Sequence, residues 1–123
     1  MFKAILWVGL GGFLGSIGRY LTGLLFTDPG SGSFPWGTFA ANILGCFLVG
    51  LFYGLSRQYD WFDSYLSLLL IVGFCGGFTT FSSFAYENIT LLQEGNYAIF
   101  ILYSSISFVT GLLAVVGGMM IIR

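Results

Sequence analysis

The segment Gly73-Phe-Cys-Gly-Gly-Phe-Thr-Thr-Phe-Ser-Ser-Phe84 places glycines, hydroxyls and aromatic rings inside a run that is otherwise apolar enough to cross a bilayer. In hydrocarbon, every unpaired backbone N–H or C=O group is costly, so an interrupted helix is tolerated only where it is buried in protein or lines a polar path. A plain lipid anchor would not need such an interruption. The segment is therefore a candidate functional site.

The composition of the whole chain is that of a membrane protein. Of its 123 residues, 57% are hydrophobic and 7% are charged, and the mean hydropathy is +0.93. Too few polar residues remain to cover a water-soluble globule. Because a transmembrane helix needs roughly 20 apolar residues, the chain has room for about four spans. This predicts an all-α protein with a single integral membrane domain over residues 1–123.

The charged residues argue against several classes of function. Four basic and five acidic residues are scattered singly and give a net charge of −1, so the sequence has no basic patch for nucleic acid or for an anionic membrane surface. The chain has no histidine, and its carboxylates lack metal-ligand or acid–base spacing, which argues against an enzyme. Cys46 and Cys75 lie inside predicted spans, where we expect reduced thiols packed as small apolar groups.

The four spans are expected at about residues 4–26, 37–55, 65–92 and 97–122. The third is too long for one straight helix across about 30 Å of hydrocarbon. We therefore expect two half-helices with a break near the middle of this span, within residues 76–79 and close to the two adjacent glycines there.

Four crossings place both termini on the same side of the membrane. The turn-forming cluster Thr27–Ser33 separates the first two spans. Lys3, Arg57 and Arg123 lie on the terminal side, which favours termini in the cytoplasm.

Glycines and one arginine mark the first span. Gly11 and Gly15 have the spacing that lets two helix backbones approach closely. Arg19 lies one turn further along the same face, and an arginine within a span must snorkel to the interface, pair with a partner or face a water-filled cavity.

Polar side chains recur at helical spacing in the second and fourth spans. Thr38 and Asn42 share one helix face, and Asn42 is either a link between helices or a donor to a desolvated anion. Tyr103 and Ser107 are also four residues apart. Hydroxyls along an apolar helix can replace an ion's hydration along a path, or they can bond back to the carbonyl one turn earlier.

Two phenylalanines follow the interruption of the third span. Phe81 and Phe84 share a face, and Ser82 and Glu87 add a hydroxyl and a carboxylate to the same half-helix. Because the edge of an aromatic ring is positive, two edge-on rings can shelter an anion such as a halide without a full positive charge. Such a pair is also common in helix cores, so both interpretations stay open.

Three motifs together carry a resemblance to a known family. They are Gly11-Gly-x-x-Gly15-x-x-x-Arg19, Gly37-Thr38-x-x-x-Asn42 and the segment Gly73–Phe84. The chain resembles the fluoride channel family of small bacterial and archaeal proteins called Fluc or CrcB, over nearly its whole length. The resemblance implies an antiparallel, dual-topology homodimer in the cell membrane, with two narrow pores lined by both chains and passive fluoride efflux that protects the cell.

The resemblance also implies roles for individual residues. A structural Na⁺ would lie at the dimer centre, held by the backbone carbonyls of Gly76 and Thr79. The expected fluoride pore and its surroundings comprise the rings of Phe81 and Phe84, the amide of Asn42, the polar track of Tyr103 and Ser107, the nearby Thr38, Ser82 and Glu87, and Arg19 at a vestibule.

Two features depart from the family pattern. Where some members carry a further hydroxyl on the polar track, this chain has Gly111, so the track is completed by Thr110, by water, or not at all. Three of the four basic residues lie on the terminal side, a stronger bias than insertion in both orientations predicts.

The alternative interpretation is a small dual-topology, proton-coupled multidrug exporter, which shares the length, the four spans and the dimer. Such a transporter needs a membrane-embedded carboxylate in its first span, where this chain has none. Glu87 is the only carboxylate within a predicted span. A third class, a purely structural membrane subunit, is disfavoured by the interrupted third span.

Overall fold

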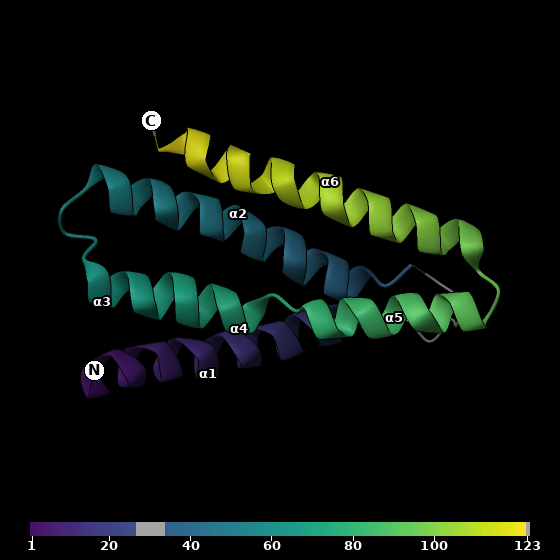
Figure 1. The fold of residues 1–123 in the computed structure, drawn as a ribbon, viewed down its shortest axis with the longest axis horizontal. Helices are drawn as coiled ribbons and strands as arrows, with labels where there is room; N and C mark the ends of the chain where they lie inside the picture. Colours follow the sequence, from purple (N-terminus) through teal and green to yellow (C-terminus); the bar gives the residue numbers. More distant parts are fainter. Residues whose placement is uncertain (27–33, 123) are drawn as a thin grey trace.

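The structure is a computed structural model, and it describes residues 1–26 and 34–122. The Thr27–Ser33 cluster and Arg123 lie outside the described residues. The helical elements, shown in Figure 1, are α1 (Phe2–Leu25), α2 (Trp36–Gln58), α3 (Ser64–Ser67), the π-helical segment η1 (Leu68–Cys75), α4 (Gly76–Phe78), α5 (Phe81–Gln93) and α6 (Tyr97–Ile121).

Four helical segments are long and apolar enough to cross a membrane. They are α1, α2, the composite segment Ser64–Gln93, and α6. With 23 residues and a rise of about 1.5 Å per residue, even α2, the shortest of the four, can reach across about 30 Å of hydrocarbon. The prediction of an all-helical, multi-pass membrane protein is thus confirmed, and each segment ends within one helical turn of its expected limit.

The helices lie side by side in the order α6, α2, the composite third span and α1 (Figure 1). Both chain ends lie at one end of the molecule, together with the connection between α2 and α3. This end carries Lys3, whose ammonium lies 4.6 Å from the ring centre of Tyr65. It also carries Trp61, which is 63% exposed, and aromatic rings of this kind are typical of a membrane–water interface.

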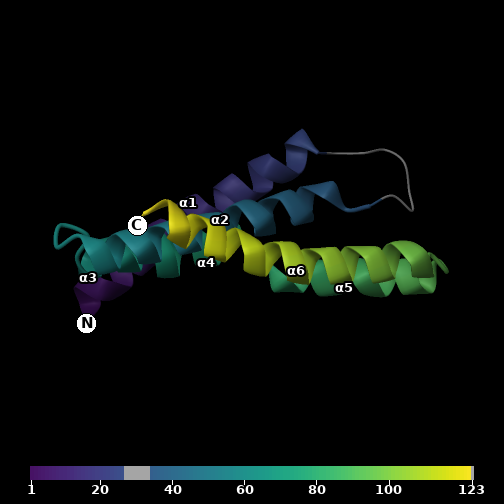
Figure 2. The ribbon, with the colours of Figure 1, turned by 90° about the horizontal axis from the view of Figure 1, so that it is seen from above.

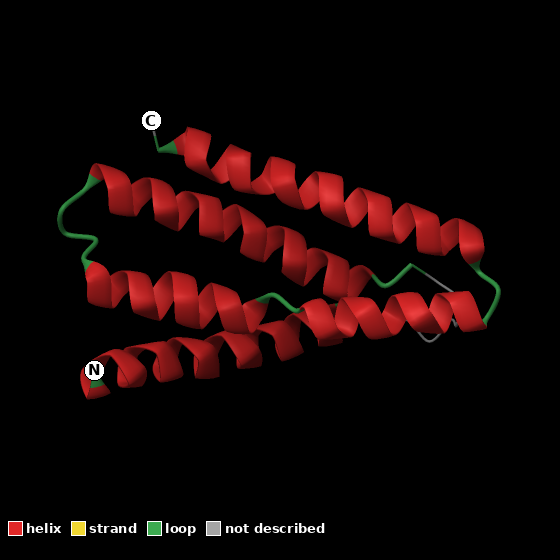
Figure 3. Ribbon diagram, viewed as in Figure 1, coloured by secondary structure: helices red, strands yellow, loops and turns green. Residues whose placement is uncertain are grey.

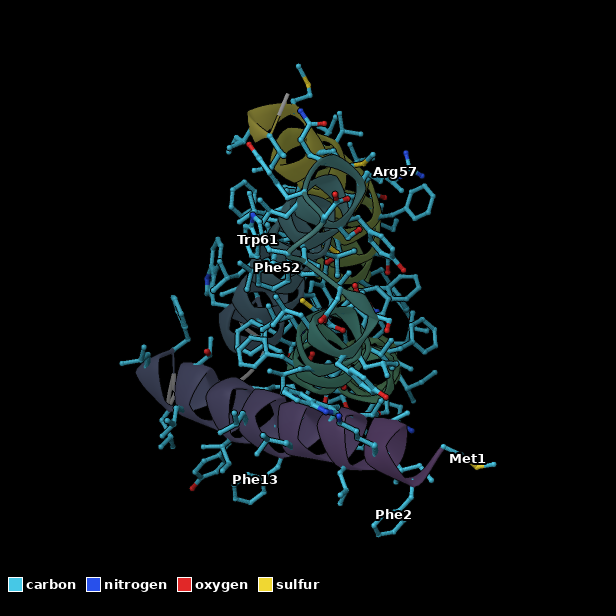
Figure 4. All side chains as sticks on the ribbon, turned by 90° about the vertical axis from the view of Figure 1, so that its left-hand side faces the viewer. Met1, Phe2, Phe13, Phe52, Arg57 and Trp61 are labelled. Atoms are coloured by element: carbon cyan, nitrogen blue, oxygen red, sulfur yellow. The ribbon has the colours of Figure 1, made fainter. Side chains whose placement is uncertain are left out.

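The outward faces of the helices are apolar. Phe2 and Phe13 are 74% and 63% exposed, and Figure 4 shows both projecting from α1 away from the other helices. In a water-soluble protein such surfaces would cause association. In a bilayer they face lipid chains, which need no hydrogen bonds.

Glycines bring helix backbones together at two seams. A Cβ atom on Gly11 or Gly15 would meet backbone carbonyl oxygens of η1. At the seam between α2 and α6, a Cβ atom on Gly50 or Gly118 would meet a backbone carbonyl of the facing helix. Because lipid supplies no hydrophobic force between helices, close backbone packing of this kind is a main source of their association.

The helical backbone of the third span is interrupted at Thr79 and Thr80, drawn as the loop between α4 and α5 in Figure 3. Thr79 has φ −82° and ψ 156°, and Thr80 has φ −148° and ψ 124°. The sequence placed the interruption near Gly76 and Gly77. Both glycines are helical, and the extended residues follow them directly.

The two threonine hydroxyls at the interruption make different bonds. Thr79 Oγ1 donates to the carbonyl of Cys75 over 2.9 Å, at the end of the first half-helix. Thr80 Oγ1 accepts from the backbone N–H of Ser83 over 3.2 Å, which caps the start of α5. Thr80 thus begins a new helix, whereas the Thr79 bond is of a kind that also occurs inside continuous helices, as at Thr22.

Candidate functional site

A cavity of about 460 Å³ lies beside the interruption, between α2, α5 and α6. Its wall is mostly apolar and contains Asn42, Phe81, Phe84 and Ser107, four of the residues singled out in the sequence. They come from three helices. A mostly apolar cavity with a few convergent polar groups is typical of a small-ligand site.

Asn42 reaches from α2 to the backbone of the interruption. Its Oδ1 accepts from the N–H of Thr80 over 2.7 Å, and its Nδ2 donates to the carbonyl of Thr80 over 3.0 Å. Both backbone groups of an extended residue are thereby satisfied where lipid offers no partner. Asn42 therefore links α2 to the interruption. A side-chain amide has two N–H donors, and the bond to Thr80 uses only one of them. Its role toward an anion stays a prediction.

The two phenylalanine rings differ in their surroundings. Their centres are 5.9 Å apart with an interplanar angle of 43°. The Phe84 ring lies 4.9 Å from that of Tyr103, so it packs within the protomer. Phe81 is 78% exposed. Core packing therefore accounts for Phe84, whereas the Phe81 ring lies beside that of Phe84 and is mostly exposed.

The carboxylate of Glu87 joins three helices. Its Oε2 accepts from Thr38 Oγ1 of α2 over 2.6 Å, and its Oε1 accepts from the Tyr103 hydroxyl of α6 over 2.8 Å. Tyr103 is fully buried. Hydrogen bonds to a carboxylate are stronger than those between neutral groups, and a membrane-embedded carboxylate needs such partners.

The hydroxyl of Ser107 is buried and has no hydrogen-bond partner among the described residues. Most buried hydroxyls are paired. Thr22 and Thr90, for comparison, bond back to carbonyls one turn earlier. The Ser107 hydroxyl makes no such bond among the described residues, and Ser107 is one of the residues that line the cavity.

Neither Ser82, which was predicted near the pore, nor Gly111, which stands where some family members have a hydroxyl, lines this cavity. Ser82 is exposed, pairs with the hydroxyl of Thr80 at 3.3 Å, and lines neither this cavity nor the one described next. Gly111 is buried in α6, and a Cβ atom there would lie 3.6 Å from the sulfur of Cys46. The interface between α2 and α6 thus has room for a small side chain at this position.

Arg19 lies at a second cavity of about 330 Å³, whose wall also contains Thr38, Thr80 and Ser83. Its Nε donates to the carbonyl of Gly77 over 3.1 Å. Of the possibilities left open by the sequence, the structure shows pairing with a helix-end carbonyl and contact with a cavity. The guanidinium has further N–H donors besides Nε.

The carbonyl of Gly76 lies at an open helix end. The N–H of Thr80, which would close the next helical turn on Gly76, donates to Asn42 instead. A Cβ atom at Gly76 would meet nothing within 4 Å. Backbone carbonyls of unwound membrane helices are typical ligands of Na⁺, so the residues present fit such an ion.

Comparison with known proteins shows to which family the chain belongs. The sequence profile described as "CrcB-like protein, Camphor Resistance (CrcB)" matches residues 6–119. The chain belongs to this CrcB-like family. The resemblance seen in the motifs is therefore confirmed.

Several CrcB-like relatives are similar over almost their whole length, and each carries the name "Fluoride-specific ion channel FluC". The relative from Azobacteroides pseudotrichonymphae is 47% identical over 118 residues, which cover 96% of this chain and 94% of the relative. One from Bacteroides fragilis is 47% identical over 119 residues, covering 94% and 93%. One from Flavobacterium psychrophilum is 46% identical over 121 residues, covering 98% of both.

Asn88 is a further buried polar residue of this CrcB-like chain, and the sequence motifs did not single it out. The side chain is 7% exposed, donates to the carbonyl of Phe84 over 3.1 Å, and accepts from the Ser104 hydroxyl over 3.1 Å. The available signal was the helical spacing of Asn88 and Phe84, which places both on one face of α5.

Proposed function

We propose that the protein is a fluoride-selective channel, and not an enzyme, that lets fluoride leave the cell passively across the cytoplasmic membrane and so protects the cell from fluoride toxicity. One observation carries the proposal. Relatives that are 46–47% identical over nearly the whole chain bear the name of a fluoride-specific ion channel.

The chemistry of the first cavity supports a path for fluoride. Fluoride is small and strongly hydrated, so conduction needs hydrogen-bond donors that replace water at successive weak sites. Asn42, Ser107, Phe81 and Phe84 line the cavity, so their amide, hydroxyl and ring edges are the groups that would bind the ion in this proposal. No charged side chain among the described residues lines it, so no fixed positive charge would trap the ion.

The neighbouring polar groups have supporting roles in this proposal. The positive charge of Arg19 would attract anions to the second cavity, which would serve as a vestibule. Thr38 and Tyr103 hold the carboxylate of Glu87 beside the path, and Ser82 adds an exposed hydroxyl near the start of α5.

We further propose an antiparallel homodimer inserted in both orientations, with a structural Na⁺ at its centre. The exposure of Phe81 supports a partner, because the ring can enclose an ion only if a second surface covers it. The open carbonyl of Gly76, with that of Thr79, would hold the Na⁺. The ion would offset the partial negative charge of carbonyl oxygens that the interruption leaves without a helical partner.

The multidrug exporter is not favoured. The relatives carry the name of a channel, and the Glu87 carboxylate already accepts hydrogen bonds from two different helices.

The direct test is fluoride efflux from liposomes that contain the purified protein, read with a fluoride electrode, with chloride efflux measured in parallel. We expect rapid fluoride release with little chloride release, and no release from protein-free liposomes. Absence of fluoride release from well-folded protein would overturn the proposal, and equal release of chloride would overturn the selectivity.

A further inference from the structure

α5 carries both rings of the proposed path, and its attachment to the rest of the protomer is narrow. It packs on α6 and more lightly on α2, and Figure 2 shows it lying along α6, away from α1. Its outward side is exposed, with Tyr86 at 73% and Ile89 at 53%. The orientation of α5 in the protomer therefore depends on a few side chains directed toward α6.

Asn88 is central to that contact. Its Oδ1 accepts from Ser104 Oγ of α6, and its Nδ2 donates to the backbone carbonyl of Phe84, each over 3.1 Å. The amide thus connects α6 to the backbone that bears one of the two rings. Asn88 itself lines neither cavity.

Packing alone does not require an amide here. Leu91, one turn further along the same face, is 4% exposed and fills its place against the neighbouring helices with an apolar side chain. A hydrogen bond adds a constraint that packing lacks, because it weakens steeply with distance and angle. A small rotation of α5 would break the Asn88–Ser104 bond and leave a polar pair unsatisfied in an apolar interface.

A second hydrogen bond lies directly beside this one. Tyr103 donates to Glu87 over 2.8 Å, so Glu87 and Asn88, adjacent on α5, bind Tyr103 and Ser104, adjacent on α6. Neighbouring residues point about 100° apart around a helix axis of 3.6 residues per turn. One bond alone would let α5 pivot, whereas two bonds in different directions fix both its rotation and its register.

We propose that Asn88 and Ser104 form a positioning pair that sets the rotation of α5, and thereby the placement of the Phe81 and Phe84 rings toward the permeating ion. This inference rests on the proposed function. It assigns to Asn88 an indirect role in conduction and in the discrimination of fluoride from chloride.

The test compares Asn88→Leu with wild-type protein in the liposome assay. We expect fluoride flux to fall by about threefold or more, the factor that corresponds to one hydrogen bond between membrane helices, and the ratio of fluoride to chloride flux to fall as well. Ser104→Ala should have the same effect, and Ser104→Thr, which keeps the hydroxyl, should restore the wild-type ratio.

Ser104 also lines the first cavity, so the double variant separates the two ways in which it could act. If Ser104 acts through Asn88, the double variant Asn88→Leu/Ser104→Ala has the flux of either single variant. Fully additive losses would mean that Ser104 acts on the ion by itself, and they would overturn the pair.

Matched controls lie on the same helices. Thr90→Val removes a hydroxyl of α5 that donates to the carbonyl of Tyr86 within the same helix. Ser105→Ala removes an exposed hydroxyl of α6. Both variants should conduct and select as wild type, because neither hydroxyl links the two helices in this way.

The outcomes separate this inference from the proposed function. A wild-type protein that releases no fluoride overturns the function, and the inference with it. A wild-type protein that conducts, together with an Asn88→Leu variant of unchanged flux and selectivity, overturns the inference alone. If Asn88→Leu does not fold, the exchanged pair Asn88→Ser/Ser104→Asn decides: recovered selectivity supports the pair, and folded protein with the defect of Ser104→Ala contradicts it.

Discussion

Asn42 directs both ends of its side-chain amide to the backbone of Thr80, and the same residue stands in the wall of the candidate path. Replacing it would leave two backbone groups unpaired in an apolar setting, at a cost of about 1–3 kcal/mol for each. A loss of activity in such a variant would not distinguish a folding defect from a lost contact with the ion. Phe81 separates these effects better, because its ring is mostly exposed.

Phe81→Ile is therefore the sharpest test at the residue scale. The substitution keeps an apolar side chain but removes the positive ring edge, so we expect fluoride flux in the liposome assay to fall by about tenfold, which corresponds to about 1.4 kcal/mol at the limiting step. Thermal stability in detergent should change little.

The matched control for this test is Phe13→Ile, on the outer face of α1, where the side chain is 63% exposed. Its flux should equal that of wild type. A Phe81→Ile variant that conducts at the wild-type rate would remove this ring from the proposed path.

At the scale of elements, hydropathy predicted the four spans because apolar content is a local property of the sequence. The position of the interruption is not local. It depends on Asn42, which lies 38 residues before Thr80 in the chain, and on the Thr80 hydroxyl, which caps the start of α5. The adjacent Gly76 and Gly77 suggested a break, yet both keep helical geometry.

For the candidate site, the sequence predicted which residues share a helix face but not which residues pair between helices. Helical spacing indicated that Thr38 and Asn42 share a face of α2, but it could not show that Thr38 binds Glu87 while Asn42 binds Thr80. Such pairings depend on which helices are neighbours and at what offset they pack. The pairing of Asn88 with Ser104 is invisible in the sequence for the same reason.

The glycine seams give a prediction for helix packing. A methyl group at Gly11 would collide with the backbone carbonyl of Leu69, which has no rotamer to move aside. We expect Gly11→Ala to lower stability by about 1–3 kcal/mol, as overpacking typically does. The measurement is the apparent melting temperature of the purified protein in detergent.

Gly9 supplies the control on the same helix. A Cβ atom there would meet nothing within 4 Å, and alanine favours helix over glycine by up to about 1 kcal/mol. Gly9→Ala should therefore leave the melting temperature unchanged or raise it. Equal losses from both variants would contradict the close contact between α1 and η1.

At the scale of the whole molecule, the two ends of the bundle differ in their basic residues. The end with the chain termini (Figure 1) carries Lys3 and Arg57 together with Asp60 and Asp63, whereas the turn between α5 and α6, residues 94–96, carries Glu94 and no basic residue. By the positive-inside rule, this asymmetry favours one orientation. An antiparallel dimer needs both orientations, so orientation and conduction should be linked.

That link can be tested by moving basic charge between the two ends. Gln58→Lys/Asp60→Lys adds lysines near the termini, and Lys3→Gln/Arg57→Gln/Glu94→Lys/Asn96→Lys moves the excess of basic residues to the opposite end. Each variant should hold most copies in one orientation. We expect either variant produced alone to lose most fluoride flux in vesicles prepared directly from cells, and the two produced together to recover it. The orientation of each variant is read from the side on which a C-terminal tag is accessible.

The control Lys3→Arg/Arg57→Lys/Glu94→Gln/Asn96→Ser changes the same positions without moving basic charge, and it should conduct as wild type. Recovery on joint production would exclude a simple loss of folding, because each variant would be functional only beside the other. Full flux from a variant whose tag is accessible from one side only would mean that a pore does not need oppositely oriented copies. The antiparallel dimer would then have to be abandoned, while fluoride conduction itself would stand.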